Sequence, residues 1–264
     1  MKYKFAKYNT SLNKITNNDN LFVGYYTLDP YQNCDFGCRY CDSTFDDTVY
    51  IKSDSLQLLE KEIKRMKKGR LIVGSVADPY QEAEKKYNIT RNFLKIIEHN
   101  DFPVHILTKS DLVLRDIDIL SKIDDCIVTI SMISLDKVIQ NIFEKNVPSS
   151  EKRLSVINDL SENGIKAGLA VMPVLPFIVE REFESIVKTA KQNRAHYLLH
   201  KHLELKGDQK AIFLKILIDI NPGLIKKYEE LYCNRYMPNQ QHVLKIKNMI
   251  NKYCKEYDIA TRIQ

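Results

Sequence analysis

The chain has 264 residues, of which 44% are hydrophobic and 28% are charged, and its formal net charge is +6 at pH 7. This length suits one large domain or two small ones, and the hydrophobic fraction is ordinary for a globular protein. No run approaches the roughly 18 apolar residues of a membrane span, and Met1–Phe5 lack the apolar core of a signal peptide. We therefore expect a soluble, cytoplasmic protein without membrane contact.

The basic residues are dispersed along the chain rather than gathered in one block. A basic surface could meet nucleic acid or another anionic partner. The lysine content could equally reflect an AT-rich gene, because AT-rich codons also favour Asn, Ile and Tyr. The net charge is therefore compatible with a nucleic-acid substrate but does not identify the substrate class.

Residues 1–20 are polar and rich in asparagine, and they predict an irregular N-terminal arm. After them, short apolar segments alternate with amphipathic segments about six times, up to residue 205. The apolar segments predict strands, and the segments with helical periodicity and capping residues predict helices. In chain order we expect a strand at 21–28, a helix at 53–67, a strand at 71–76, a helix at 89–98, a strand at 104–108, a helix at 112–123, a strand at 126–132, a helix at 149–162, a strand at 165–171, a helix at 180–192 and a strand at 196–199.

This alternation is typical of a parallel sheet covered by helices. Six strand–helix units are too few for a closed eight-unit barrel, so the expected α/β fold is an open, partial (β/α)6 TIM-like barrel over residues 21–205. Functional side chains in such sheets lie at the C-terminal ends of the strands. Residues 206–264 predict a C-terminal helical extension that caps the barrel, with helices at 209–220, 222–232 and 240–257.

A group of three cysteines directly follows the first predicted strand. Cys34, Cys38 and Cys41 are separated by three and then two residues. Thiolates are the ligands that iron–sulfur clusters prefer, and three of them would leave one iron of a cubane open to a substrate or cofactor. Gly37 suits the tight curl of such a loop. Two alternatives fit the pattern less well, because zinc usually takes two ligand pairs and an odd number of close cysteines suits local disulfides poorly.

The spacing Cys-x-x-x-Cys-x-aromatic-Cys, with Tyr40 as the aromatic residue, resembles the signature of the radical S-adenosylmethionine (SAM) enzymes. The resemblance implies a [4Fe–4S] cluster on the three cysteines, whose open iron binds the amino and carboxylate groups of SAM. It also implies the partial barrel, reductive cleavage of SAM to a 5′-deoxyadenosyl radical, and a reductant such as flavodoxin or ferredoxin. Tyr40 would lie against the SAM adenine, unless it only packs the loop.

Several residues at predicted strand ends are candidates for binding SAM. Many radical SAM proteins carry a glutamate for the SAM amino group after the second strand, and Asp78 is an acceptor near that place. Asp78 and Tyr80 are also the candidate catalytic residues, although their Asp-Pro-Tyr-Gln run could form only a turn. Lys109 ends the third strand and could bind the SAM carboxylate. The other candidates, each with a solvated or packing role as its alternative, are Ser75, Ser131, Arg153 and Met172.

A narrower resemblance covers residues 22–180. The runs Gly-Ser-x-x-Asp-Pro-Tyr-Gln from Gly74, Thr-Lys-Ser from Thr108 and Met-Pro-Val-Leu-Pro from Met172 resemble the spore photoproduct lyase-like branch of radical SAM proteins. In that branch a cysteine near the end of the second strand returns a hydrogen atom to the substrate radical. Ser75 occupies approximately that position here, and a hydroxyl is a far poorer hydrogen-atom donor than a thiol. We therefore do not expect direct repair of a DNA lesion by this route.

The sequence leaves the substrate open between a nucleic acid, a peptide and a small metabolite. A rival from another class is a non-catalytic metal-binding scaffold protein that keeps the cysteines as a zinc knot. Cys126 begins a buried strand and is expected to be a small apolar core residue. The residues without an assigned role are Cys233 and Cys254, which are too few for a second cubane, and His196, His200 and His202.

Overall fold

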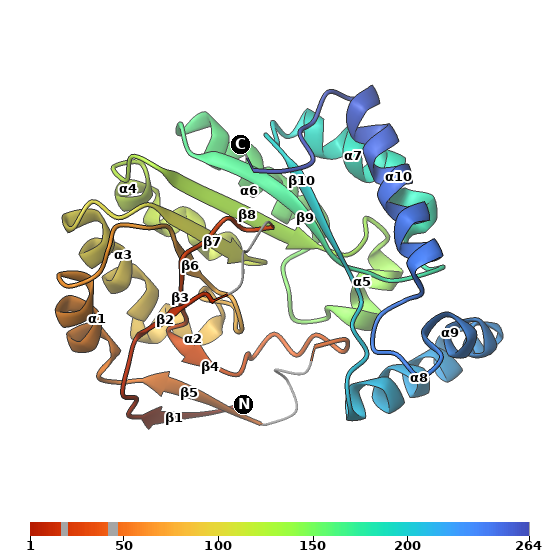
Figure 1. Ribbon diagram of the computed structural model, residues 1–264, viewed down its shortest axis with the longest axis horizontal. Coiled ribbons are helices and arrows are strands. Elements are labelled where there is room, and N and C mark those ends of the chain that lie inside the picture. Colours follow the sequence, from red (N-terminus) through yellow and green to blue (C-terminus); the bar gives the residue numbers. More distant parts are fainter. Residues whose placement is uncertain (17–20, 42–46, 264) are drawn as a thin grey trace.

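The computed structural model describes residues 1–16, 21–41 and 47–263, and an open sheet forms its centre (Figure 1). Within these residues the sheet has seven strands in the order β10-β9-β8-β7-β6-β3-β2, with β2 antiparallel at the edge and the other six parallel. The six parallel strands confirm the predicted partial (β/α)6 barrel. The strands are β2 (Leu12–Lys14), β3 (Tyr26–Leu28), β6 (Leu71–Val73), β7 (Val104–Thr108), β8 (Cys126–Met132), β9 (Lys166–Val174) and β10 (Leu198–His202).

Helices cover the sheet between successive strands. All residues of β8 are buried, and α6 (Ser150–Glu162) packs against β8 and β9. This helix begins where Ser149 Oγ accepts a hydrogen bond from Lys152 N at 3.2 Å, and its Leu154 and Leu160 are buried. Burying one such side chain stabilises the fold by about 1.5–3 kcal/mol. The other helices here are α1 (Ser55–Ile63), α2 (Glu82–Tyr87), α3 (Ile89–His99), α4 (Ile117–Leu120), α5 (Lys137–Phe143) and α7 (Phe183–Gln192), with 3₁₀ turns at Asp111–Asp116 and Glu180–Glu182.

Three helices follow β10 in the described residues, as predicted for the C-terminal part of the chain, and an isolated bridge between Ala260 and Tyr197 comes after them. The helices are α8 (Asp208–Ile220), α9 (Ile225–Tyr232) and α10 (Gln240–Glu256), with a 3₁₀ turn at Pro222–Leu224. α10 packs along α7, and α8 and α9 lie together at one end of the molecule (Figure 1).

Two buried tyrosines attach α9 to the barrel. Tyr228 donates a hydrogen bond to Pro176 O at 2.7 Å, and Tyr232 donates one to Leu203 O at 2.9 Å. Both acceptors belong to segments that leave the C-terminal ends of β9 and β10, so the extension is fixed to the edge of the sheet where functional groups gather. Among the helices of the described ranges, none combines the length and the apolar character that crossing a bilayer requires.

The N-terminal segment is not the irregular arm that its polar composition predicted. β1 (Lys2–Ala6) pairs in parallel with β5 (Thr48–Lys52), and β4 (Tyr31–Gln32) completes a separate three-stranded sheet. β1 does alternate between polar and apolar residues, with Tyr3 and Phe5 alternating with lysines, but the asparagine-rich composition of residues 1–20 as a whole outweighed this short pattern. Its pairing with a distant segment is also invisible to a local sequence pattern.

Four strands of the main sheet differ from their predicted bounds, and those expected at 71–76 and 196–199 are observed at Leu71–Val73 and Leu198–His202. The strand expected at 21–28 is shorter, because its pairing with β6 covers only Tyr26–Leu28. β9 instead continues past Pro173 to Val174, although this proline was expected to end it. Proline lacks the backbone N–H that a central strand needs. The pairing of β9 with β8 already ends at Val171, so Pro173 interrupts no hydrogen bond on that side.

Candidate active site

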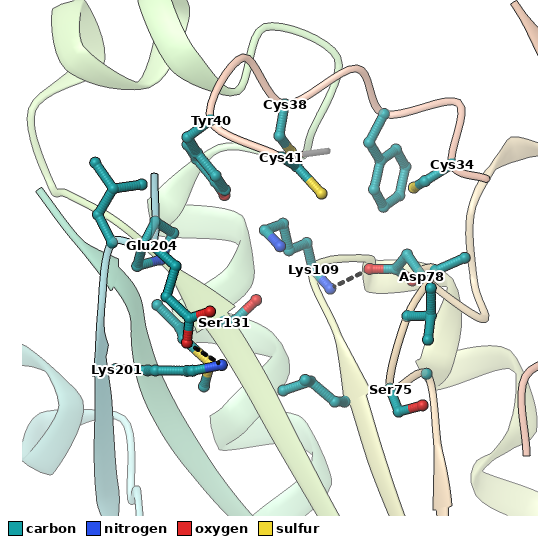
Figure 2. A pocket seen from close by; sticks show the side chains of 18 of the residues that line it. Cys34, Cys38, Tyr40, Cys41, Ser75, Asp78, Lys109, Ser131, Lys201 and Glu204 are labelled. Atoms are coloured by element: carbon teal, nitrogen blue, oxygen red, sulfur yellow. Dashed lines mark hydrogen bonds and ion pairs between the residues drawn. The ribbon is translucent and has the colours of Figure 1, made fainter. Parts of the chain in front are cut away.

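A cavity of about 360 Å³ lies at the C-terminal edge of the main sheet (Figure 2). Its wall combines the cysteine loop, the residues at the ends of β6 to β9, and the segment that leaves β10. Parallel sheets place functional side chains at this edge. The candidates from the sequence that line the cavity are Cys34, Cys38, Tyr40, Cys41, Ser75, Asp78, Lys109, Ser131 and Met172.

The three cysteines of the motif border the same cavity, and none of them is in a disulfide (Figure 2). Cys34 and Cys38 are buried and Cys41 is half-buried. The loop curls where Cys41 N donates a hydrogen bond to Cys38 O at 3.0 Å, and where Gly37 has a φ of +63°. A residue with a side chain would be strained in that left-handed conformation, so glycine is needed at this point of the loop.

Neighbouring elements hold the cysteine loop at both ends. The Asp35 carboxylate accepts hydrogen bonds of 3.1 Å from the first two amides of α2, and Asp35 N donates to Gln81 Oε1 at 2.9 Å. At the other end, Arg39 N donates to Phe143 O at 2.9 Å. These contacts fix the position of the loop through its backbone and the Asp35 side chain.

A buried ion pair between Glu144 and Arg153 holds the Tyr40 hydroxyl in place. The Tyr40 hydroxyl donates a hydrogen bond to Glu144 Oε1, and Arg153 Nη2 donates to Glu144 Oε2 at 2.7 Å. Arg153 Nη1 also donates to Ser131 O at 2.8 Å. Burial, together with the nearby Cys38 and Glu144, raises the pKa of Tyr40 well above its usual value, so the hydroxyl keeps the proton that it donates.

Arg153 therefore occupies a different place from the one expected for it. The sequence suggested an anion-binding guanidinium in the site, but Arg153 is fully buried against Glu144 and does not line the cavity. Glu144 was not a candidate, because a glutamate between a predicted strand and a predicted helix carries no signal of its burial. The pair instead connects the cysteine loop with the end of β8.

Asp78 lies between the segment after β6 and the end of β7. Its Oδ1 accepts hydrogen bonds from Thr108 Oγ1 at 2.7 Å and Tyr80 N at 2.9 Å, and its Oδ2 accepts one from Lys109 N at 2.7 Å. Burial raises the pKa of this carboxyl, while the three hydrogen bonds act in the opposite direction. A carboxylate has about four acceptor positions, so one direction remains for a ligand in the cavity.

Tyr80, the other candidate catalytic residue, does not line the cavity. Its side chain is buried, and the Arg115 guanidinium lies 6.0 Å from the centre of its ring. Arg115 in turn forms an ion pair of 2.7 Å with the buried Glu84. The Asp-Pro-Tyr-Gln run thus directs Asp78 toward the site and Tyr80 toward the packed layer between helices.

Lys109 brings a positive charge to the cavity wall beside the thiols (Figure 2). Its Nζ lies 6.0 Å from the centre of the Tyr40 ring. Burial alone would lower the pKa of this ammonium, but Cys38, Glu144 and Asp78 raise it above its usual value, so it stays charged. Burial raises the pKa of the Cys38 thiol to about 12, although Lys109 acts to lower it. Metal binding to these cysteines would therefore release protons.

The two serine candidates have different surroundings. Ser75 is exposed and donates a hydrogen bond from Oγ to Asp29 Oδ2 at 2.7 Å. Ser131 is buried at the end of β8, where its side chain borders the cavity. Met172 supplies an apolar surface at the end of β9. Together they give the wall hydroxyl and thioether groups opposite the cysteine loop.

Sequence reasoning missed one part of the wall. Of the three histidines without an assigned role, His202 lines the cavity, together with charged or amide side chains close to it in the sequence. Lys201 and His202 end β10 and the others come soon after it, so the rule that selected Lys109 at the end of the third strand would also have pointed to this part of the chain. The charged and amide residues are Lys201, Glu204, Lys206 and Gln209.

Residues 28–190 match the family model described as the radical SAM superfamily, a range that contains the cysteine loop and the ends of β6 to β9. The chain belongs to the radical SAM superfamily. Enzymes of this superfamily use a [4Fe–4S] cluster and SAM, and these are the cofactors of this chain.

The donor set of this radical SAM chain fits the cluster. Each iron of a cubane takes one thiolate, so three thiols that border one cavity meet the requirement and leave one iron open. Among residues 1–16, 21–41 and 47–263, no three His, Cys, Asp or Glu side chains are grouped as a single metal ion would need.

Relatives of this radical SAM protein occur in an archaeon, bacteria and a virus. An uncharacterized protein of Methanocaldococcus jannaschii is 32% identical over 169 residues, which are 60% of this chain and 63% of that protein. One of Mycobacterium bovis is 26% identical over 243 residues, covering 84% of this chain and 71% of that protein. One of Acidianus two-tailed virus is 32% identical over 186 residues, covering 66% of this chain and 61% of that protein. The chain thus spans about two thirds of the length of these relatives.

Solved radical SAM structures share the fold. Spore photoproduct lyase complexed with dinucleoside spore photoproduct superposes with a TM-score of 0.72 at 15% identity, covering 97% of this chain and 79% of that chain. Streptococcus suis SuiB bound to precursor peptide SuiA gives a TM-score of 0.62 at 13% identity, covering 89% of this chain and 47% of that chain. At such low identity the likeness establishes the architecture, and the substrate of this chain is a separate question.

Proposed function

We propose that this chain is an enzyme that cleaves SAM reductively and abstracts a hydrogen atom from a bound substrate. When bound, the cluster and SAM supply this chemistry: one electron from a reductant such as flavodoxin or ferredoxin splits SAM into methionine and a 5′-deoxyadenosyl radical, which takes the hydrogen atom. The observation that carries the proposal is that Cys34, Cys38 and Cys41 border one cavity with Lys109 and Asp78. We assign the reaction to a barrel of residues 21–205 and propose that it takes place in the cytoplasm.

The chain's own residues bind and orient SAM in this proposal. The Lys109 ammonium binds the SAM carboxylate, and the Asp78 carboxylate accepts a hydrogen bond from the SAM amino group. Tyr40 and Met172 border the adenine, whose flat apolar face suits an aromatic ring and a thioether. The hydroxyls of Ser75 and Ser131 are placed to meet the ribose. These roles match the charge or polarity of each side chain to one part of SAM.

Anaerobic reconstitution tests the proposal and its rival. We expect about four irons with sulfide per chain, and 5′-deoxyadenosine after addition of SAM and a reductant. The variant with Cys34→Ala, Cys38→Ala and Cys41→Ala should lose both the iron and the product, whereas Cys126→Ala, at the start of β8, should lose neither. Stoichiometric zinc in place of iron would instead support a metal-binding scaffold protein.

A second candidate function is repair of the spore photoproduct in DNA, which the shared fold with spore photoproduct lyase favours. The exposed Ser75 stands against it, because its hydroxyl is hydrogen-bonded to Asp29 and is a poor source of a hydrogen atom. A nucleic acid without this lesion, a peptide such as the one SuiB binds, and a small metabolite are the other substrate classes that we keep.

We predict that this protein does not repair the lesion and that Ser75→Cys does not create repair. The measurement is anaerobic incubation of the reduced protein with SAM and ultraviolet-irradiated DNA, followed by analysis of released thymine. Thymine formation by the natural protein above a control without SAM would contradict the prediction and make lesion repair the preferred function.

A further inference from the structure

Part of the cavity wall carries polar side chains to which the SAM-binding proposal gives no role. Lys201 and His202 end β10, Glu204 and Lys206 follow in the connection to α8, and Gln209 lies in the first turn of that helix. Figure 2 shows Lys201 and Glu204 across the cavity from Cys34 and Asp78. Lys201 and Glu204 therefore face the part of the wall that holds Cys34 and Asp78 (Figure 2).

Gln209 has an acceptor that lacks a partner. The residue is only 3% exposed, and its Nε2 donates a hydrogen bond to Arg39 O at 3.3 Å. A backbone carbonyl only accepts, so this contact fixes which end of the amide is the NH₂ group. Gln209 Oε1 is then left buried without a hydrogen-bond partner in the described part of the chain. An unpaired buried acceptor costs about 1–3 kcal/mol, and an N–H or O–H group of a ligand would remove that cost.

His202 presents a second unpaired atom in the same part of the wall. Its side chain is 7% exposed, and Nδ1 is buried with no partner among the residues that the structure describes. Burial, followed by the charges of His200 and His242, lowers the pKa of His202 to about 4. The ring is therefore neutral near pH 7, and a neutral ring offers one donor nitrogen and one acceptor nitrogen.

The charges of this region do not cancel. Glu204 forms ion pairs with Lys201 Nζ at 3.0 Å and with Lys206 Nζ, so two ammonium groups share one carboxylate. Lys201 and Lys206 have half-exposed side chains and can turn toward a ligand, whereas Glu204 is 23% exposed. An anionic group could enter here by taking one lysine from Glu204, because charge-assisted hydrogen bonds form readily between ammonium and phosphate or carboxylate.

We infer that Lys201, His202, Glu204, Lys206 and Gln209 form a substrate subsite for a compound that carries an anionic group next to an N–H or O–H donor. The anionic group is a phosphate or a carboxylate, which pairs with Lys201 and Lys206. The donor meets Gln209 Oε1, and His202 accepts or donates a further hydrogen bond. The inference rests on the proposed function, because a substrate must share the cavity with SAM to lose a hydrogen atom to it.

Small anions test this subsite in the reconstituted protein with saturating SAM, which occupies the open iron. The probes are inorganic phosphate, glycolate and acetate, and their dissociation constants are measured by titration calorimetry. Glycolate differs from acetate by one hydroxyl donor, so we expect glycolate to bind several-fold more tightly, and Gln209→Leu to remove that preference. The better of phosphate and glycolate identifies the anionic group that the subsite takes.

The lysine variants test the charged part separately. Lys201→Met with Lys206→Met should weaken binding of phosphate and glycolate at least tenfold, while Glu204→Gln should strengthen it by releasing both ammonium groups. Lys215→Met, an exposed lysine of α8, is the matched control and should change nothing. Circular dichroism checks that each variant is folded.

Three results would separate the possible failures. Unchanged anion binding in the double lysine variant overturns the subsite, even if the enzyme cleaves SAM. An equal loss of SAM affinity in that variant overturns it too, because these residues would then hold the cofactor. If the natural protein forms no 5′-deoxyadenosine at all, the proposed function fails, whether or not anions bind to the lysines.

Discussion

Asp78 shows that a turn residue and a site residue can be the same residue. Three hydrogen bonds from Tyr80 N, Thr108 Oγ1 and Lys109 N tie its carboxylate to the end of β7, and the same carboxylate borders the cavity. The two interpretations of the Asp-Pro-Tyr-Gln run were alternatives in the sequence. In the structure Asp78 both forms the turn and lines the cavity, because the turn places its carboxylate at the cavity wall.

Lys109 is the residue at which a single charge should matter most. We expect Lys109→Met to weaken SAM binding about tenfold or more, because losing one charge-assisted hydrogen bond costs on the order of 1.5–3 kcal/mol. Titration with SAM at constant cluster occupancy measures this change. Lys215→Met serves as the control for loss of a positive charge on the surface. An unchanged dissociation constant for Lys109→Met would remove this residue from the SAM site.

At the scale of elements, Glu144 and Arg153 join four parts of the fold. Arg153 lies in α6, Glu144 directly follows α5, and their contacts reach Tyr40 in the cysteine loop and the backbone of Ser131 in β8. Both side chains are fully buried. Removing one partner would leave an uncompensated buried charge, whereas removing both would not.

We therefore predict that Glu144→Gln and Arg153→Met each lower the free energy of unfolding by about 3–5 kcal/mol. The double variant should lose clearly less than the two single losses combined, because the partners form one interacting unit. Denaturant unfolding of the four proteins, without added cofactor, measures the coupling. Strictly additive losses would show that the two side chains act independently.

The sequence predicted some elements closely and others not at all, for physical reasons. β8 and α6 were expected within a residue of their bounds, since a mostly apolar, β-branched run and a capped, periodic helix are local signals. β1 has only a short alternation of lysine with Tyr3 and Phe5, and its pairing with the distant β5 cannot be read from a local pattern. The cysteines are a local motif as well, whereas the burial of Glu144 and the orientation of Arg153 depend on contacts between distant segments.

At the scale of the whole molecule, cofactor binding should increase the stability of the folded protein. A ligand that binds only the folded state stabilises it, by about 2.7 kcal/mol at a concentration 100 times its dissociation constant. We expect SAM to raise the thermal midpoint of the reconstituted protein. The triple cysteine-to-alanine variant should show a much smaller shift, because it lacks the iron that SAM chelates. An equal shift in both proteins would mean that SAM binds without the cluster.

The hydrogen bond from Gln209 to Arg39 joins residues 170 positions apart and closes the cavity between the cysteine loop and α8. During synthesis the three cysteines leave the ribosome long before Gln209 does. At about 5–20 residues per second, this interval lasts on the order of 10–30 s. A cluster inserted on the growing chain would face water and oxygen for that time. Iron delivery to the finished chain would avoid that exposure. The cluster should therefore be inserted after translation has passed Gln209.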